Sequence, residues 1–191
     1  MDTTAPRART ILDFWFGAPP HAERAEWFRK DPAFDERIRS DFLADVEGAL
    51  DGGFHAWEAD PHGTLALVLL LDQFPRNLFR DTPRAFAGDA RALSVAEAAI
   101  GRGFDRSLDR YERWFLYMPF EHAESVAAQD RSLELFGRLA VEAGLEAPLE
   151  WARKHAEVIS RFGRYPHRNT ILGRVSSPEE IAFLATPGSR F

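Results

Sequence analysis

The chain has 191 residues, of which 45% are hydrophobic and 13% aromatic, and this size and composition suit one folded domain rather than a disordered segment. It contains no cysteine, which excludes disulfides, thiolate catalysis and cysteine-ligated metal centres. The net charge of −6 argues against a nucleic-acid-binding protein, because such proteins normally present a basic face.

Helix signals run through the whole chain, and no stretch alternates as a surface strand does. The sequence predicts helices at about residues 10–16, 21–28, 32–50, 61–74, 83–100, 108–118, 125–143, 148–162 and 177–185. Their apolar positions recur at helical spacing, and glycine or proline stands near most of their ends. We therefore predict an all-α chain that forms a single domain over residues 1–191.

Capping residues mark the start of several of these helices. Asp31-Pro32 and Asp60-Pro61 each combine an N-cap acid with a proline in the first turn. Ser177 and Glu180 have the spacing of a capping box. Prolines are also expected to end two helices, at Pro75 and at Pro119.

Neither a membrane span nor a targeting signal is expected. The longest apolar run, residues 65–71, is far shorter than the about 20 residues that a membrane helix needs. It is predicted to be a helix buried on nearly all sides. Residues 1–9 lack the apolar stretch of a signal peptide, so we expect a cytoplasmic protein without a membrane partner.

The first candidate site follows the most apolar helix. Gln73, Arg76 and Asn77 come directly after that run, and Arg76 and Arg80 are spaced to share a helix face. One interpretation is an anion site that the two amides orient. The other is a network of Asp72 with the arginines that joins two helices, since buried ion pairs also occur without any catalytic role.

The second candidate site follows the aromatic helix at Pro119. His122 lies between Glu121 and Glu124, and an imidazole beside carboxylates can act as a general base. The alternative is a helix N-terminus that is enriched in acids because the helix dipole favours them.

The third candidate site is the densest positive cluster in the chain. Arg164, His167, Arg168 and Asn169 lie together in a segment with glycine and proline, a composition that suits phosphate or carboxylate. Alternatively, the arginines cap helix C-termini and pair with the surplus acids.

Signatures of cofactors and metals are not found. The histidines and acids have none of the spacings typical of metalloproteases or di-iron bundles, so no metal is expected. Phosphate-loop, dinucleotide and nucleophile-elbow motifs are missing as well, and no cofactor is expected.

Three motifs together resemble a bacterial family of unknown function with a tetratricopeptide-like helical fold. They are LDQFPRN at residues 71–77, MPFEHAE at 118–124 and FGRYPHRN at 162–169. The resemblance implies a compact array of antiparallel helix pairs and implies no activity. Because turns at one end of such an array lie near one another, the three candidate sites are predicted to line one pocket. That pocket would contain Gln73, Arg76, Asn77, His122, Glu124, His155, Arg164, His167, Arg168 and Asn169.

Two functions remain open from the sequence. In the first, the pocket binds a small anionic metabolite, with His122, His167 and Glu124 exchanging protons and the remaining residues binding the ligand. In the second, the chain is a tetratricopeptide-like module that binds a protein or a peptide carboxylate. The sequence does not decide whether the protein is an enzyme, nor its oligomeric state.

Overall fold

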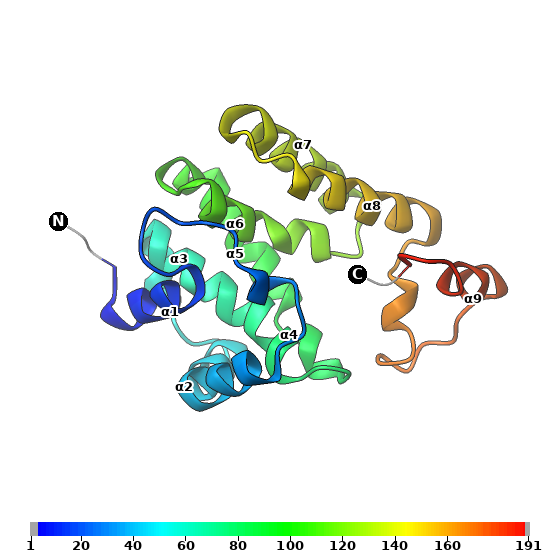
Figure 1. Cartoon of the computed structure of the whole chain (residues 1–191), viewed down its shortest axis with the longest axis horizontal. Helices are drawn as coiled ribbons and strands as arrows, with labels where there is room; N and C mark the ends of the chain where they lie inside the picture. The colour runs from blue at the N-terminus through cyan, green and yellow to red at the C-terminus, as the bar shows by residue number, and fades with distance from the viewer. Residues whose placement is uncertain (1–3, 190–191) are drawn as a thin grey trace. The chain divides into compact units, whose positions relative to one another are not determined.

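The computed structural model describes residues 4–189, and all regular elements in that range are helical (Figure 1). The α-helices are α1 Pro6–Phe16, α2 Pro32–Leu50, α3 Pro61–Val68, α4 Phe74–Leu78, α5 Asp89–Gly101, α6 Arg110–His122, α7 Val126–Ala143, α8 Ala147–Phe162 and α9 Pro178–Leu184. A π-helical turn, Leu69–Gln73, joins α3 to α4. Short 3-10 turns lie at Ala25–Trp27, His55–Ala59, Pro83–Phe86, Phe104–Ser107 and Pro166–Arg168. The prediction of an all-α chain is confirmed, whereas the tetratricopeptide-like arrangement stays a prediction.

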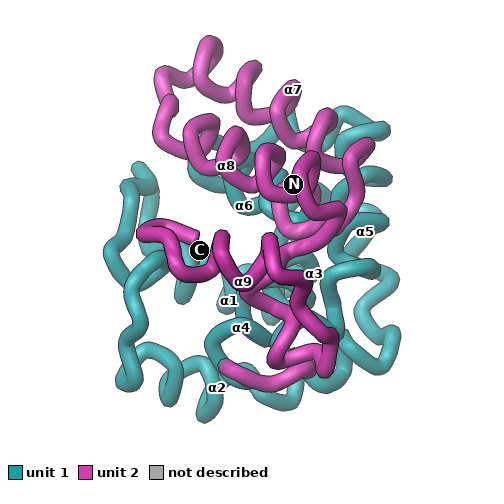
Figure 2. Tube along the Cα trace, turned by 90° about the vertical axis from the view of Figure 1, so that its right-hand side faces the viewer, with its two compact units in different colours: residues 1–80, 84–119 teal, residues 81–83, 120–191 magenta. Residues whose placement is uncertain are grey.

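The chain divides into two compact units (Figure 2). Unit 1 comprises residues 1–80 and 84–119, and unit 2 comprises residues 81–83 and 120–191. Helix α6 runs across the boundary, so its last turn belongs to unit 2. The prediction of a single domain over residues 1–191 stays a prediction.

The predicted capping residues act as expected. The Asp31 side chain accepts hydrogen bonds from the amides of Ala33 and Phe34 at the start of α2. The Asp60 side chain accepts one from Gly63 at the start of α3. Ser177 and Glu180 form the predicted capping box of α9. These signals are local in sequence, which is why they could be read without a structure.

Two predicted helices are shorter than expected. Within residues 21–28 only the 3-10 turn at 25–27 forms. The helix expected from Pro83 begins only at Asp89, after a separate 3-10 turn. Between them Gly88 packs so closely on the Leu71 carbonyl that a Cβ there would lie 2.2 Å from its oxygen. This close contact requires glycine, a poor helix former, at the point where the predicted helix is interrupted.

The predictions that Pro75 and Pro119 end helices are wrong. Helical structure continues through Pro75, because the π-helical turn precedes it and the amide of Phe74 bonds the carbonyl of Leu69, five residues back. Pro75 has no backbone N–H to donate to the preceding turn. The π-helical turn shifts the backbone hydrogen-bond pattern by one residue just before this position. Pro119 lies inside α6, so Glu121 and His122 occupy its last turn. The alternative interpretation, which placed these two residues at a helix N-terminus, is therefore wrong as well.

Aromatic rings fill the core of unit 1. The Trp15 ring lies 5.5 Å from the Phe74 ring and 5.4 Å from the Phe115 ring, measured between centroids. Trp27 packs edge-on against Phe115 at 4.8 Å. The apolar run at residues 65–71 is fully buried, as predicted. Gln73 and Arg76 follow directly on this packed helix, which fixes the direction of their side chains.

Unit 2 contains the antiparallel helices α7 and α8, which lie side by side in both views (Figures 1 and 2). Val158, Ile159 and Tyr165 form a buried cluster, with Phe162 and Phe183 packed against it. The chain therefore folds back after α8, and this return brings residues 164–169 against the unit's own core.

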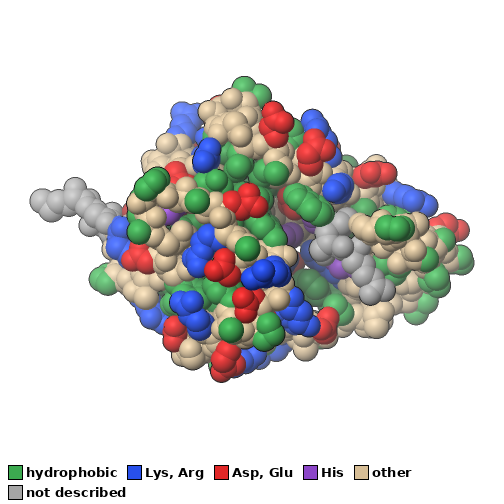
Figure 3. Space-filling model, in the orientation of Figure 1, with side chains coloured by type: hydrophobic (Ala, Val, Ile, Leu, Met, Phe, Trp, Pro, Cys, Tyr) green, Lys and Arg blue, Asp and Glu red, His purple; other side chains and the backbone are tan. Residues whose placement is uncertain are grey.

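Charged side chains of both signs are interspersed over the face shown in Figure 3. Among residues 4–189, no helix is both long and apolar enough to cross a membrane. The cytoplasmic location stays a prediction.

Candidate functional site

The residues predicted to line one pocket are divided between the two units. Gln73, Arg76 and Asn77 belong to unit 1. Unit 2 contains the other members, namely His122, Glu124, His155, Arg164, His167, Arg168 and Asn169. A common pocket therefore stays a prediction.

In unit 1, Arg76 and Gln73 contact carboxylates. Arg76 donates to both oxygens of Asp89, at 2.9 and 3.1 Å, and to the carbonyl of Asp72 at 2.5 Å. Gln73 donates to the carboxylate of Asp72, whose side chain is fully buried, at 2.5 Å. This arrangement joins α4 to the first turn of α5.

Asn77 lies in a similar pair of contacts. Its amide donates to Asp35 Oδ1 at 2.7 Å, and Arg80 donates to both oxygens of the same carboxylate at 2.7 and 2.8 Å. Burial raises the pKa of Asp35, but the hydrogen bonds from Arg80 and Asn77 outweigh burial and hold that pKa below its ordinary value. These contacts connect α4 to α2.

Tyr165 is the centre of the group in unit 2. Its side chain is fully buried, and its hydroxyl donates to the Glu121 carbonyl at 2.5 Å. The Gln129 amide nitrogen lies 3.0 Å from that hydroxyl and also contacts the carbonyls of Phe120, Glu121 and Ala123. The two N–H groups of this amide are thus shared among carbonyls at and just after the end of α6, which a helix cannot satisfy by itself.

Two imidazoles and a guanidinium contact this tyrosine, and a third imidazole lies next to one of them. The rings of His155 and His167 each lie 5.5 Å from the Tyr165 ring, measured between centroids, and the His122 ring lies 6.4 Å from that of His155. The Arg168 guanidinium carbon lies 4.6 Å from the centre of the Tyr165 ring. We call Tyr165, the three histidines and Arg168 the imidazole cluster.

Two of these imidazoles are neutral at pH 7. Burial, aided by the charge of Arg168, lowers the pKa of His155 to about 3 and that of His167 to about 4. His155 Nδ1 lies 2.9 Å from the Trp151 carbonyl. A carbonyl only accepts, so Nδ1 donates and Nε2 is the nitrogen of this neutral ring that can take up a proton.

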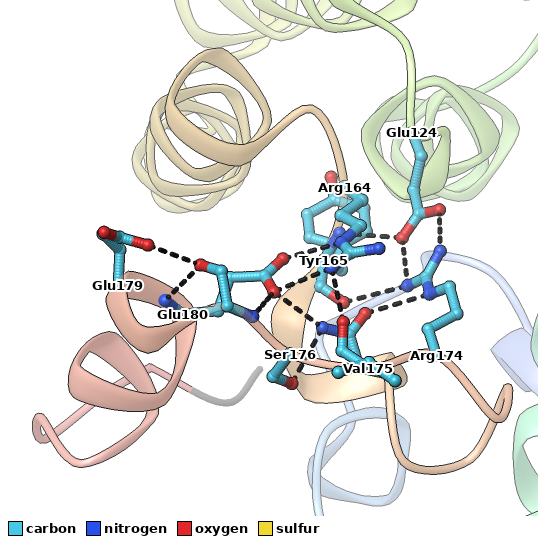
Figure 4. A network of polar contacts seen from close by, with 10 residues as sticks. Glu124, Arg164, Tyr165, Arg174, Val175, Ser176, Glu179 and Glu180 are labelled. Carbon is cyan, nitrogen blue, oxygen red and sulfur yellow. Dashed lines mark hydrogen bonds and ion pairs between the residues drawn. The ribbon is translucent and has the colours of Figure 1, made fainter.

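Glu124 is held by Arg174 beside the cluster (Figure 4). Arg174 donates to both carboxylate oxygens at 2.6 and 2.9 Å, and the Tyr165 amide donates to one of them at 2.7 Å. Burial raises the pKa of Glu124, but these hydrogen bonds outweigh burial and lower that pKa overall. Arg174 also donates to Asn169 Oδ1 at 2.9 Å.

Arg164 forms a second pair with a carboxylate in the same view (Figure 4). It donates to both oxygens of Glu180, at 2.7 and 2.8 Å, and to the Val175 carbonyl at 2.9 Å. The hydrogen bond from Arg164 lowers the pKa of Glu180 to about 2. Asn169 donates to the same carboxylate at 3.2 Å. Arg164 and Asn169 therefore fix the start of α9.

An open hollow of about 550 Å³ lies next to this pair. Arg161, Phe162, Arg164, Ser177, Glu179 and Glu180 line it. A second hollow of about 110 Å³ shares Arg161 and Phe162 with the first and also contacts Lys154 and Phe183. Both signs of charge line the larger hollow.

Sequence reasoning did not single out Tyr165, Gln129 or Arg174 as members of a site. Arg174 belongs to a Leu-Gly-Arg triplet, which could have drawn attention to it, but nothing in the sequence connects it to Glu124. Sequence reasoning also missed His21, Asp109 and Glu112, whose ligand atoms all lie within 4.8 Å of one another. Among the described residues, no three metal-ligand side chains of the imidazole cluster have ligand atoms this close to one another.

Comparison with known proteins gives a family and a related structure. A model of a family described as "Bacterial protein of unknown function (DUF924)" matches residues 11–188. A solved structure of a protein of unknown function from Agrobacterium tumefaciens is 41% identical in sequence, with a TM-score of 0.85. The similarity covers 94% of this chain and 97% of that chain. None of the curated proteins matches the sequence significantly.

Proposed function

Because the chain belongs to DUF924, a family of bacterial proteins of unknown function, we propose a function from the geometry of unit 2. It binds a small anion, a phosphate or a carboxylate, at Arg168 and the imidazoles of His122 and His167. The observation that carries this proposal is the gathering of two imidazoles and one buried guanidinium around the Tyr165 ring, with the His122 imidazole beside His155. Guanidinium and imidazole donors are the groups that recognise such anions.

The electrostatics of the cluster support an anion rather than a cation. Arg168 is buried and its charge lowers the pKa of His155 and of His167, so it contributes a positive potential at both rings. Two carboxylates lie nearby: Arg174 pairs with Glu124, and Glu121 Oε1 lies 3.2 Å from His155 Nδ1. A bound anion would favour the protonated form of His167, so binding takes up a proton.

This coupling gives the cluster its acid–base chemistry. His167, neutral in the free protein, takes up a proton when the anion binds and releases it when the anion leaves. We assign Glu124 a fixed negative charge instead of proton exchange, because its lowered pKa keeps it ionised. Arg164 and Asn169 then orient the loop through Glu180.

The test is isothermal titration calorimetry of the full chain with orthophosphate and with succinate. We expect one of the two to bind, and Arg168→Gln to weaken that binding about tenfold or more, as the loss of a charged hydrogen bond predicts. Arg153→Gln is the matched control, since Arg153 lies exposed on α8 and pairs only with Glu150 in the described contacts. Arg168→Lys keeps the charge and checks that the loss does not come from unfolding.

Proton uptake gives an independent measure of the same binding. Titrations at one pH in buffers of different ionisation enthalpy report the protons taken up, and we expect His167→Gln to reduce that number. Equal affinity of wild type and Arg168→Gln for both anions would contradict the proposal.

The second candidate function, a module that binds a peptide, has support from the larger hollow. Phe162 supplies an apolar wall, and Arg161 supplies a cation that can meet a peptide carboxylate. A panel of peptides with free C-termini, screened on wild type and Arg161→Gln, tests it. Peptide binding that Arg161→Gln abolishes and Arg168→Gln leaves unchanged would favour this function over anion binding.

A further inference from the structure

A group of metal-ligand type lies in unit 1, apart in sequence from the imidazole cluster. The side-chain ligand atoms of His21, Asp109 and Glu112 all lie within 4.8 Å of one another. His21 comes from the segment after α1, and the two acids stand at the start of α6. Sequence spacing could not reveal the group, because His21 and Asp109 are 88 positions apart.

Each carboxylate has one oxygen bound to the helix. Asp109 Oδ1 accepts from the amides of Tyr111 and Glu112 at 2.8 and 3.0 Å. Glu112 Oε2 accepts from the Asp109 amide at 2.8 Å, which completes a capping box. These bonds hold both carboxylates in fixed orientations and satisfy the amides that would otherwise oppose a cation at a helix N-terminus.

The other oxygen of each carboxylate faces an imidazole. Asp109 Oδ2 lies 2.6 Å from His21 Nδ1, and Glu112 Oε1 lies 3.4 Å from His62 Nε2. The His21 ring packs against Phe16, with 5.3 Å between ring centroids, which fixes its orientation. The oxygens and the imidazole nitrogen that a metal would need are therefore positioned by other contacts.

We propose that His21 Nδ1, Asp109 Oδ2 and Glu112 Oε1 bind a divalent transition-metal ion, with Zn²⁺ the preferred ion. One imidazole and two carboxylates are zinc ligands in proteins, and imidazole favours zinc over calcium or magnesium. Zinc bonds of about 2.0–2.2 Å place tetrahedral ligand atoms about 3.3 Å apart, so small side-chain rotations close the group around the ion.

Because the site is open to solvent, water would be the fourth ligand of the ion. The Asp109 side chain is 42% exposed, whereas those of His21 and Glu112 are 10% and 7% exposed. The ion therefore has a route of entry on the side of Asp109. His62 Nε2 lies 3.4 Å from Glu112 Oε1, and this contact orients the carboxylate.

The test is a Zn²⁺ titration of the full chain, purified without a histidine tag and freed of metal with a chelator. Competition against a chromophoric chelator gives the stoichiometry and the dissociation constant. We expect one equivalent to bind to wild type and His21→Ala to weaken binding at least about tenfold, as loss of a ligand group does. His21 does not cap α6, so this variant leaves the helix start intact.

His55→Ala is the matched control. His55 pairs with Glu58 at 3.1 Å in the same unit, so its removal also breaks a histidine–carboxylate pair but leaves the proposed ligands in place. We expect His55→Ala to bind Zn²⁺ as wild type does. Failure of wild type to bind one equivalent, or equal affinity in wild type and His21→Ala, would overturn the proposal.

Substitution by Co²⁺ reports the geometry of the site. Four-coordinate Co²⁺ gives intense visible absorption, which we expect in wild type and in His55→Ala and not in His21→Ala. Glu112→Gln should also lose the absorption, and circular dichroism of that variant checks that α6 still forms. Identical spectra of wild type and His21→Ala would contradict the assignment of His21 as a ligand.

Discussion

Residues 72–80 of unit 1 and the imidazole cluster of unit 2 both place polar side chains against a buried apolar background, but they balance charge differently. In the first region, Arg76 lies against Asp89 and Arg80 against Asp35. In the second, Arg168 lies over the Tyr165 ring, and burial keeps His155 and His167 neutral. Charge-balanced pairs between helices stabilise a fold, whereas neutral bases beside a cation can respond to a ligand or to a proton.

The largest expected effect on stability comes from removing an ion pair of residues 72–80 in unit 1. Arg76→Met should lower the free energy of unfolding by about 4 kcal/mol, because the fully buried Asp72 and the partly buried Asp89 lose their cation. Urea unfolding followed by circular dichroism measures the change. Arg153→Met, which removes an exposed pair on α8, should change the free energy by less than about 1 kcal/mol. Equal effects of the two variants would show that the pairs of unit 1 do not stabilise it.

The second largest expected effect is the pH dependence of stability that the imidazole cluster of unit 2 produces. The folded-state pKa values of His155 and His167 lie below the ordinary value of 6.5, so the unfolded chain binds protons that the folded chain does not. The contribution of these two neutral histidines to the free energy of unfolding is fully present above pH 6.5 and is lost as the pH drops toward 4. The displacement of the His167 pKa to about 4 corresponds to a loss of about 3 kcal/mol.

Chemical denaturation of wild type and His167→Gln between pH 4 and pH 7 measures this loss. Glutamine does not titrate, so the variant should lose less stability on acidification than wild type by about 3 kcal/mol. His55→Gln removes an exposed histidine and should keep the wild-type profile. Parallel profiles for wild type and His167→Gln would show that His167 titrates normally.

The smallest expected effect on stability concerns the start of α9, where Arg164 and Glu180 form a charge-balanced pair like those of unit 1. Ser177→Ala removes the cap of α9 and should cost about 1 kcal/mol, because the Glu180 amide loses its acceptor. Hydrogen exchange of the α9 amides should speed up about fivefold, while exchange in α7 stays unchanged. Unchanged exchange in α9 would mean that Arg164 and Asn169 alone fix the position of Glu180.

Local signals explain what the sequence could predict. The caps at Asp31, Asp60 and Ser177 act on amides two or three residues away, so their partners are visible in the sequence. The helical assignments of residues 125–143 and 148–162 rest on the same kind of local signal. Four motif residues, His122, His167, Arg168 and Glu124, lie at or beside the cluster in unit 2, whereas their membership of one site with the other motif residues stays a prediction.

Partners that are distant in the sequence explain what could not be predicted. Arg174 and Glu124 are 50 positions apart, and Arg80 and Asp35 are 45 positions apart, so a carboxylate could not be assigned to either arginine from spacing. The capping box at Asp109 and Glu112 is itself local, but its proximity to His21 depends on the path of the chain after α1. The breaks expected at Pro75 and Pro119 were wrong, because a π-helical turn leads into Pro75 and α6 continues through Pro119.

The π-helical turn at residues 69–73 also changes how the helical segment at 61–78 should be compared with other sequences. A bond between Phe74 and Leu69 spans one residue more than an α-helical bond, so the turn holds one extra residue relative to a regular helix. Positions before and after it are therefore out of phase by about 100° around the helix axis. An alignment to a chain with a regular α-helix here requires a one-residue gap within 69–73. Without that gap, Asp72 and Arg76 would be matched to residues on the wrong face.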